Sequence, residues 1–325
     1  MYIMLIYDII FKKEVKFMFN FSNSNKRYHT LDYFYKNKFN SKVFKVSLNG
    51  GFSCPNKDGK VGKRGCIYCS RSGSGDYAGN IKDDLITQFD EIKEMMCKKW
   101  PNSKYIAYFQ ANTNTYAPLP ILKEKYETVY KLPNVVGLSV ATRPDAIEND
   151  VYDYLEKLNN ETYLTVELGL QSIHEDTNNL INRCHDLKCF ETAVSELRKR
   201  KINVVVHIIN GLPYETKNMM IETAKYLNTL DIQGIKIHML HILKNTDLYD
   251  LYKKDKFDIL SRDEYVEIVV EQLRYLRPEI VINRITGDPK ESDLVEPVWL
   301  VKKFGVLNEI DKYMAKNDIY QGDKT

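Results

Sequence analysis

The chain lacks the features of a membrane-spanning or secreted protein. Its apolar N-terminal run, MYIMLIYDII, contains Asp8, has no basic region before it and leads to Lys12 and Lys13 without a small-residue cleavage site. This pattern argues against a signal peptide, and the run is shorter than the roughly 20 apolar residues that cross a bilayer. The sequence also has no repeat of solenoid length and no low-complexity tract. We therefore expect no membrane association.

A strong excess of one charge is also missing. The 47 Lys and Arg residues nearly balance the 44 Asp and Glu residues, and the net charge of +3 is too small to identify a partner. With 43% hydrophobic and 28% charged residues, the composition is that of a soluble globular protein. A chain of 325 residues can hold one large α/β domain or two small ones.

Cysteine is scarce and unevenly placed. The six cysteines stand at positions 54, 66, 69, 97, 184 and 189, and three of them share one short glycine-rich stretch. This is a ligand pattern and not a disulfide framework, and it favours a reducing cytoplasm. Met18 offers a second start, so residues 1–17 are either a dispensable extension or a first element that packs on the core.

Apolar, β-branched segments alternate with helical segments along most of the chain. Strands are predicted at residues 43–48, 104–110, 135–142, 164–171, 203–211 and 232–240. Helices are predicted at residues 83–100, 120–132, 150–158, 191–201 and 217–230, and again in the tail at 263–276 and near the C-terminus. Parallel neighbours joined by right-handed helical crossovers give a partial (β/α)6 barrel. A flat doubly wound sheet is the alternative, and in both folds ligands gather at the carboxyl ends of the strands.

This alternation divides the α/β chain into three parts. Residues 1–40 form an N-terminal extension with a first helical element, residues 41–245 the core barrel, and residues 246–325 a helix-rich C-terminal extension on the substrate side.

The strongest motif is the cysteine loop GGFSCPNKDGKVGKRGCIYCS, which follows the first strand and spaces Cys54, Cys66 and Cys69 as C-x11-C-x2-C. Three thiolates in a cuboidal iron–sulfur cluster leave one iron free for a substrate or cofactor. The glycines allow the loop to fold tightly, and Tyr68 can shield the cluster or stack on a base.

A zinc site with a distant His or Cys as fourth ligand is the alternative. The place of the loop, at the catalytic mouth of a β/α repeat, favours the reactive centre. Cys97 is expected to pack on its helix, and Cys184 and Cys189 are expected to be bystanders, so we predict one cluster.

Further motifs give the chain a family resemblance. Together with the cysteine loop, it resembles the radical S-adenosylmethionine (SAM) proteins of the MnmL (YtqA/YhcC) group, and more distantly the Elp3-type enzymes and the oxygen-independent coproporphyrinogen oxidases. The resemblance covers about residues 27–322 and rests on FQANTNTYAP, ATRPD, ELGLQS, INRCHD, INGLPYET, KIHMLHILKNTDL and RITGD. Three positions depart from the group's pattern, namely Asn49 before the two glycines of the loop, Asn112 and Tyr214, and they put the fine fit of SAM and substrate in question.

The resemblance implies a [4Fe-4S] cluster on the three cysteines, whose open iron chelates SAM and, once reduced, cleaves it to a 5′-deoxyadenosyl radical. It places Gln110 and the stretch from Asn112 to Asn114 near the methionine end of SAM. The Arg183 guanidinium would bind the SAM carboxylate through two parallel hydrogen bonds. The remaining cofactor contacts implied are Tyr68, Glu167, Gln171 at the ribose, His207 and Gly211 beside it, and Leu240 with His241 at the adenine.

Each of these residues also has a simpler interpretation. Arg183 could form a surface ion pair, Glu167 could hydrogen-bond at the barrel mouth, and His207 and His238 lie in apolar strands where core histidines are common.

The resemblance also implies the substrate, which is tRNA whose wobble uridine 34 carries a 5-carboxymethylaminomethyl group that becomes 5-aminomethyl. A flavodoxin or ferredoxin would donate the electron, and a separate tRNA methyltransferase would complete the product. Residues 26–39 interleave basic and aromatic residues, and a basic RKRK run stands at 198–201. Both are compatible with RNA, although RKRK equally suits a solvated helix face. Arg284 and Asp288 in RITGD are the predicted substrate contacts. A radical SAM enzyme for a small molecule and a non-enzymatic metal-binding adaptor remain the alternatives.

Overall fold

The computed structural model describes residues 19–325, so the prediction about residues 1–17 lies outside the described part. Seven strands form one parallel sheet in the order β1-β2-β3-β4-β5-β6-β8, and β7 pairs with β9 in a small antiparallel sheet. The main strands are β1 (Val43–Leu48), β2 (Lys104–Phe109), β3 (Val135–Thr142), β4 (Tyr163–Gln171), β5 (Asn203–Asn210), β6 (Gly234–Met239) and β8 (Val281–Arg284). The small sheet comprises β7 (Ile242–Leu243) and β9 (Leu294–Glu296).

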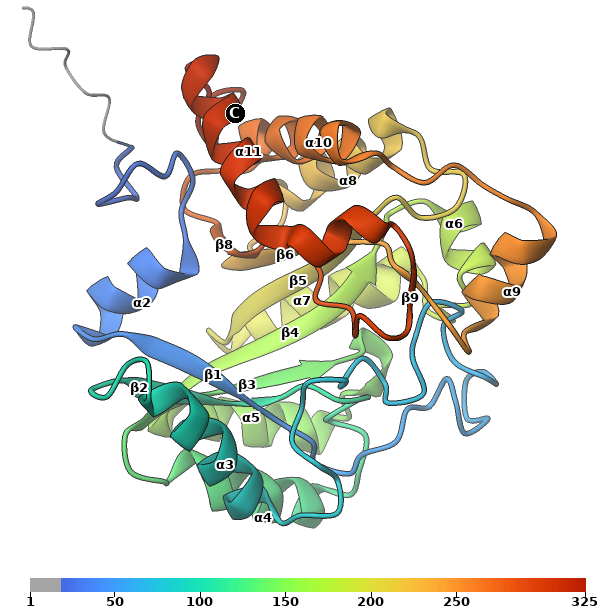
Figure 1. The fold of residues 1–325 in the computed structure, drawn as a ribbon. Helices are drawn as coiled ribbons and strands as arrows, with labels where there is room; N and C mark the ends of the chain where they lie inside the picture. The colour runs from blue at the N-terminus through green and yellow to red at the C-terminus, as the bar shows by residue number, and fades with distance from the viewer. Residues whose placement is uncertain (1–18) are drawn as a thin grey trace, which may run out of the picture.

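The strand order decides between the two predicted folds. Strands follow one another across the sheet without a reversal, whereas a doubly wound sheet reverses its order at a switch point. Right-handed crossovers then place the helices on one face. Figure 1 shows the sheet curled, with α3 and α4 below it and α8 and α10 above it, so that these helices cover the outer face of the curl. The fold is the predicted partial barrel.

Helices connect the strands and cover the outside of the barrel. They are α2 (Leu31–Phe39), α3 (Leu85–Cys97), α4 (Leu119–Tyr130), α5 (Asn149–Glu161), α6 (Glu175–Leu180), α7 (Leu187–Lys199), α8 (Lys217–Leu227), α9 (Asp247–Lys254), α10 (Arg262–Tyr275) and α11 (Lys303–Lys316), with the short 3-10 helices η1 (Pro144–Ala146) and η2 (Val298–Lys302). Their starts follow capping rules: the Asp84 side chain accepts from two backbone N–H groups of α3, and Ser261 and Glu264 form a capping box on α10. No helix among the described residues has the length and apolar character needed to cross a membrane.

The sheet has one strand more than the six predicted. β8 lies in the predicted C-terminal extension, yet it pairs in parallel with β6, the last predicted core strand. Arg284 ends this strand and stands opposite Lys236 in the register. The segment around RITGD therefore begins in the barrel wall, which places its first residue beside the interior.

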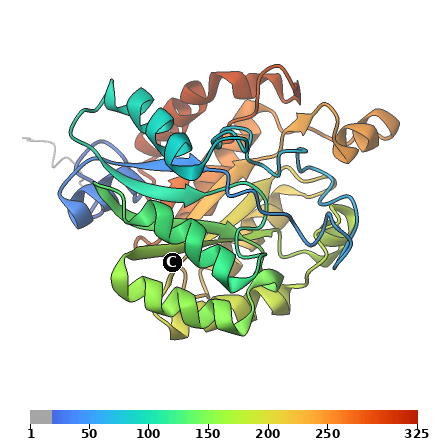
Figure 2. The same ribbon diagram turned by 90° about the horizontal axis from the view of Figure 1, so that it is seen from below.

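Helix α2 closes the amino-terminal end of the sheet. Tyr35 is buried against Val43 and Ile106 at the beginnings of β1 and β2, while the residue before the helix, Thr30, forms an isolated parallel bridge with Ile282 of β8. Figures 1 and 2 show α2 at one end of the strands and the long loop after β1 at the other. The basic and aromatic stretch of residues 26–39 thus lies at the opposite end of the strands from the cysteine loop, and its contact with RNA stays a prediction.

Candidate active site

The cysteine loop lies between β1 and α3, at the carboxyl ends of the strands. Tight turns shape it: the Cys54 carbonyl accepts from the N–H of Lys57 at 2.8 Å, and the Cys66 carbonyl accepts from the N–H of Cys69 at 3.0 Å. Gly59 and Gly65 have φ values of +97° and +82°, a conformation that side chains rarely adopt. Backbone geometry therefore brings the three cysteines to one cavity, which all three line.

The three thiols are suited to a cluster. Burial raises the pKa of Cys66 to about 11, reinforced by Cys69, and burial also raises the pKa of the Cys69 thiol. Such buried thiols become thiolates when metal ions supply compensating positive charge. Among residues 19–325, no three His, Cys, Asp or Glu side chains are grouped to hold a single metal ion. Cys54, Cys66 and Cys69 would instead bind one iron each of a cuboidal cluster, as predicted.

The other cysteines do not line this cavity. The Cys97 Sγ on α3 lies 2.8 Å from the Tyr105 hydroxyl, and the Cys184 Sγ lies close to Gly62 of the cysteine loop. That these cysteines are bystanders stays a prediction.

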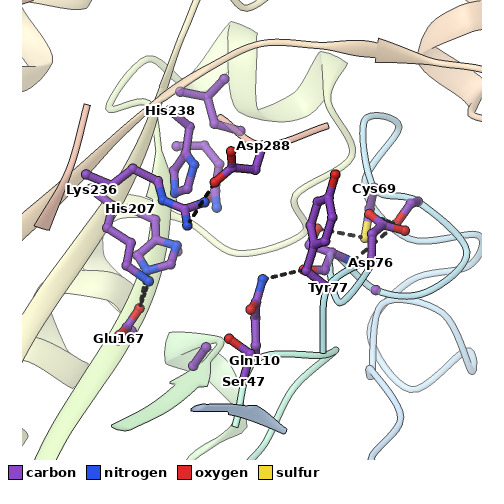
Figure 3. Close-up of a pocket in the computed structure, with 18 of the residues that line it drawn as sticks. Ser47, Cys69, Asp76, Tyr77, Gln110, Glu167, His207, Lys236, His238 and Asp288 are labelled. Atoms are coloured by element: carbon purple, nitrogen blue, oxygen red, sulfur yellow. Dashed lines mark hydrogen bonds and ion pairs between the residues drawn. The ribbon is translucent and has the colours of Figure 1, made fainter. Parts of the chain in front are cut away.

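The cavity holds about 720 Å³ and extends from the cysteine loop into the barrel. Thirteen of the fifteen site residues proposed from the sequence line it, which are Cys54, Cys66, Tyr68, Cys69, Gln110, Asn112, Glu167, Gln171, Arg183, His207, Leu240, Arg284 and Asp288. Figure 3 shows Cys69 on one side and Glu167, His207, Lys236 and His238 on the other, with Gln110 between them.

Asn114 and Gly211 do not line the cavity of the described residues. Asn114 is fully buried, and its amide joins two strands by donating to the Phe109 and Ala141 carbonyls at 3.1 and 2.7 Å. The Gly211 N–H points to the Met220 sulfur at 3.2 Å. Both residues shape the wall, and their predicted contact with SAM is not tested by this geometry.

Gln110 and Asn112 lie beside the cysteine loop. The Gln110 amide donates to the Ser74 carbonyl at 2.9 Å, and the Asn112 Oδ1 accepts from Lys57 at 3.2 Å. Asn112 has φ +60°, a conformation that asparagine tolerates better than most residues. These contacts fix the loop against the end of β2.

Gln171 ends β4 in an unusual conformation. Its φ is +62°, and the pairing of β4 with β5 shifts between Gly169 and Gln171. The bulge turns the Gln171 side chain toward the cavity, which it lines. Its Oε1 is buried and has no hydrogen-bond partner among the described residues. A buried acceptor without a donor is costly, so this atom fits a ligand hydroxyl such as the predicted ribose.

Arg183 is almost completely buried and bonded to the backbone. Its guanidinium donates to the carbonyls of Leu170, Ser172 and His185, including 2.9 Å from Nη1 to Ser172 and 2.8 Å from Nη2 to His185. This side chain therefore locks the end of β4 to the INRCHD segment. Most of its donors are occupied, and its predicted bond to the SAM carboxylate remains a prediction.

A charged group fills the barrel interior around Glu167. The carboxylate accepts from Lys45, Lys236, Ser139, Tyr108 and His207, with distances of 2.7 Å to both Ser139 and His207 and 3.1 Å to Tyr108. We call these six residues the Glu167 group.

The pKa values of this group reflect burial and charge together. Burial alone would raise the pKa of Glu167, but Lys236 and Lys45 hold it well below its ordinary value. Burial lowers the pKa of Lys236 to about 7 against the pull of Glu167, and lowers that of His207 to about 4. His207 is thus a neutral imidazole that donates to Glu167.

The sequence prediction missed Lys45, Tyr108 and Lys236. A usable signal was present, because parallel strands covered on both faces are normally apolar throughout, and Lys236 and His238 alternate in β6. Polar residues at every second position of such a strand indicate that the interior of the barrel is polar.

Comparisons with known proteins agree with this site. Residues 59–227 match the Radical SAM superfamily, and residues 232–316 match the Radical_SAM C-terminal domain. The chain is 54% identical to YtqA of Bacillus subtilis over 94% of both chains. It is 32% identical to YhcC of Escherichia coli K12 over 87% of this chain and 90% of that protein. The resemblance to YtqA and YhcC that the motifs predicted is thus confirmed.

More distant likeness extends to tRNA enzymes and their fold. A tRNA uridine(34) acetyltransferase of Methanocaldococcus infernus is 25% identical over 57% of this chain and 34% of its own length. The solved structure of the Elp3 protein from the same organism has a TM-score of 0.65 at 18% identity, covering 86% of this chain and 64% of that one, which shows the shared fold. Radical SAM proteins bind a [4Fe-4S] cluster and SAM, and the thiols and the unpaired Gln171 acceptor fit both groups. With half of its length matched and a cysteine loop at the carboxyl ends of the strands, the chain belongs to the radical SAM superfamily.

Proposed function

We propose that the protein modifies uridine 34 of tRNA, converting a 5-carboxymethylaminomethyl group into a 5-aminomethyl group. The observation that carries the proposal is the mouth of the cavity, where exposed aromatic rings and lysines border the entrance to the cysteine site. The distant relative named for acetylation of tRNA uridine 34 supports the same nucleotide as substrate.

The mouth is suited to an unpaired nucleotide. Tyr77 and Lys303 line the cavity, and the side chains of Tyr77 and the adjacent Phe304 are 57% and 72% exposed. Exposed rings stack on unpaired bases, and lysines contact phosphates. The RKRK run lies outside the lining of this cavity and pairs with acids of the chain, including Arg198 with Asp231 at 2.9 Å. We therefore place RNA at the mouth and not on that helix.

The chemistry divides between the cofactors and the chain. When bound, the cluster and SAM would supply a 5′-deoxyadenosyl radical that takes a hydrogen atom from the methylene of the carboxymethyl group. With SAM as the two-electron oxidant and one water added, the carbon–nitrogen bond would break to leave the amine and release the carboxymethyl group as glyoxylate. The chain's own residues position the reactants: the three cysteines hold the cluster, and Gln171 aims into the cavity from its bulge.

Two protein partners belong to this proposal. A cytoplasmic flavodoxin- or ferredoxin-type protein would donate the electron, and a tRNA methyltransferase would act on the 5-aminomethyl product. Basic residues in and just after the cysteine loop, among them Lys63 and Arg71, favour an acidic electron donor.

The test is an anaerobic assay of the reconstituted protein with dithionite, SAM and tRNA that carries the 5-carboxymethylaminomethyl group. We expect 5′-deoxyadenosine and a nucleoside whose mass has fallen by the carboxymethyl group. Turnover without RNA, or an unchanged nucleoside despite 5′-deoxyadenosine release, would contradict the tRNA substrate and favour a small molecule.

A pair of variants on α11 tests the mouth. Phe304→Ala should weaken tRNA binding by about tenfold, since stacking on one base contributes roughly 1–3 kcal/mol. Tyr313→Ala, nine residues further along the same helix and so not adjacent to the cavity-lining Lys303, is the matched control and should bind tRNA as the wild type does.

A further inference from the structure

The inner wall of the cavity contains two cations on neighbouring strands. Lys236 of β6 and Arg284 of β8 are partners in the strand register, and both line the cavity. Lys236 is only 6% exposed. Arg284, whose side chain is 37% exposed, lies nearer the solvent and remains reachable for a ligand.

The acids of this wall are too few for its cations. Glu167 is shared by Lys45 and Lys236. Asp288 is shared in the same way by Arg284, at 3.4 Å, and by Lys303. Two carboxylates thus face four basic side chains in this wall. Burial lowers the pKa of Lys236 to about 7, and an anion bound beside it would stabilise its charged form.

His238 adds a donor at the same place. It follows Lys236 by two residues in β6, and its Nε2 is buried without a partner among residues 19–325. Burial and the neighbouring His207 hold the pKa of His238 well below its ordinary value, so the ring is neutral and can donate one N–H. The histidine thus offers a hydrogen bond without adding to the charge.

We propose that Lys236, His238 and Arg284 form a binding site for the carboxylate of the substrate's side group. An arginine forks onto a carboxylate with two hydrogen bonds, and a lysine adds a point charge. Lys236 and His238 lie across the cavity from Cys69 of the cysteine loop (Figure 3), so a bound carboxymethyl group would present its methylene carbon toward the cofactor side. This inference rests on the proposed function, because it assigns the part of the enzyme that recognises the group to be removed.

Binding without turnover tests the site separately from the reaction. Two anticodon stem-loops are compared in fluorescence anisotropy without reductant, one with the 5-carboxymethylaminomethyl group and one with its neutral carboxamide. We expect the wild type to bind the acid about tenfold more tightly than the amide, a ratio set by one ion pair of about 1.4 kcal/mol. In Lys236→Met and in Arg284→Gln the ratio should fall to about one.

Arg284→Gln is included because Lys236 is buried and its substitution could unfold the protein. Arg284 is partly exposed, so its variant is expected to fold and to test the site. Arg262→Gln, which alters a surface pair with Glu309 on the outer helices, is the control and should keep the wild-type ratio.

Three results would overturn the inference. The first is equal binding of acid and amide by the wild type, which leaves the proposed function intact if the tRNA assay still shows conversion. The second is a preference that survives in both variants. The third is loss of the preference at saturating SAM, which would show that the site holds the carboxylate of SAM. Failure of the wild type to bind either stem-loop would remove the proposed function together with this inference.

Discussion

Gly169 leaves the space that the side chain of Gln171 occupies: a Cβ at position 169 would lie 2.6 Å from the Gln171 Nε2. The two residues flank the register shift between β4 and β5. The ELGLQS motif therefore combines a bulge, a glycine and a residue with positive φ to aim one amide into the cavity.

We expect Gly169→Ala to displace the Gln171 side chain and to weaken SAM binding by about tenfold, which corresponds to ~1.4 kcal/mol. Equilibrium binding of SAM to the reconstituted protein measures this effect. Gly305→Ala is the control, because a Cβ there meets nothing within 4 Å and an alanine favours the helix. Equal SAM affinity in the two variants would mean that Gln171 does not contact SAM.

Cys66→Ala should abolish the cluster, since it removes one of the three predicted iron ligands. The measurement is iron and sulfide content after anaerobic reconstitution, with the absorbance of the cluster as a second readout. Cys184→Ala removes an exposed thiol outside the cavity and should keep the full iron content. A full cluster in Cys66→Ala would refute the ligand assignment.

Arg183→Lys should destabilise the protein by about 2–4 kcal/mol, because a lysine cannot reach the three carbonyls that the guanidinium satisfies. Urea unfolding measures the loss. Arg262→Lys, at a half-exposed surface pair, should change stability by less than about 0.5 kcal/mol. An unchanged stability combined with weaker SAM binding would instead favour the predicted role of Arg183 at the SAM carboxylate.

The lowered pKa of Lys236 predicts a pH dependence. The pKa of Lys236 is about 7 in the folded protein and about 10.4 in an unfolded chain. Between these two pH values the lysine is mostly neutral when folded, so unfolding takes up a proton. Stability must therefore rise with pH above 7, by up to ~1.4 kcal/mol per pH unit. Thermal midpoints of wild type and Lys236→Met between pH 6.5 and 8.5 test this, and we expect the wild type to gain about 1–3 °C per unit relative to the variant. Parallel curves would contradict the assignment.

The sequence predicted the repeating part of the fold closely. β1 and β3 match the predicted ranges, and the other four predicted strands differ by one or two residues at their ends, because long β-branched runs and amphipathic helices have distinct periods. β8 was missed since it has only four residues and its pairing with β6 depends on a contact made after two further helices. Such a contact has no local signal.

The same division holds within the site. The cysteines could be predicted because their spacing along the chain fixes their proximity. The Glu167 group could not, because its six members come from six different strands, and Lys45 by itself resembles a solvent-facing residue. Arg183 could be identified as important from its motif, but its bonds to three carbonyls depend on how the loop returns to the end of β4.

The floor of the cavity has a different origin from its walls. Leu31 and Tyr35 of α2 line the cavity at the end away from the cysteines, whereas the walls come from the strands that hold the charged groups. The depth of the cavity and the charged groups that line it are thus determined by separate segments of the chain. Substitutions on α2 can lengthen or shorten the chamber without moving a cluster ligand, so related proteins can adapt the size of the group they accept while their radical machinery stays the same.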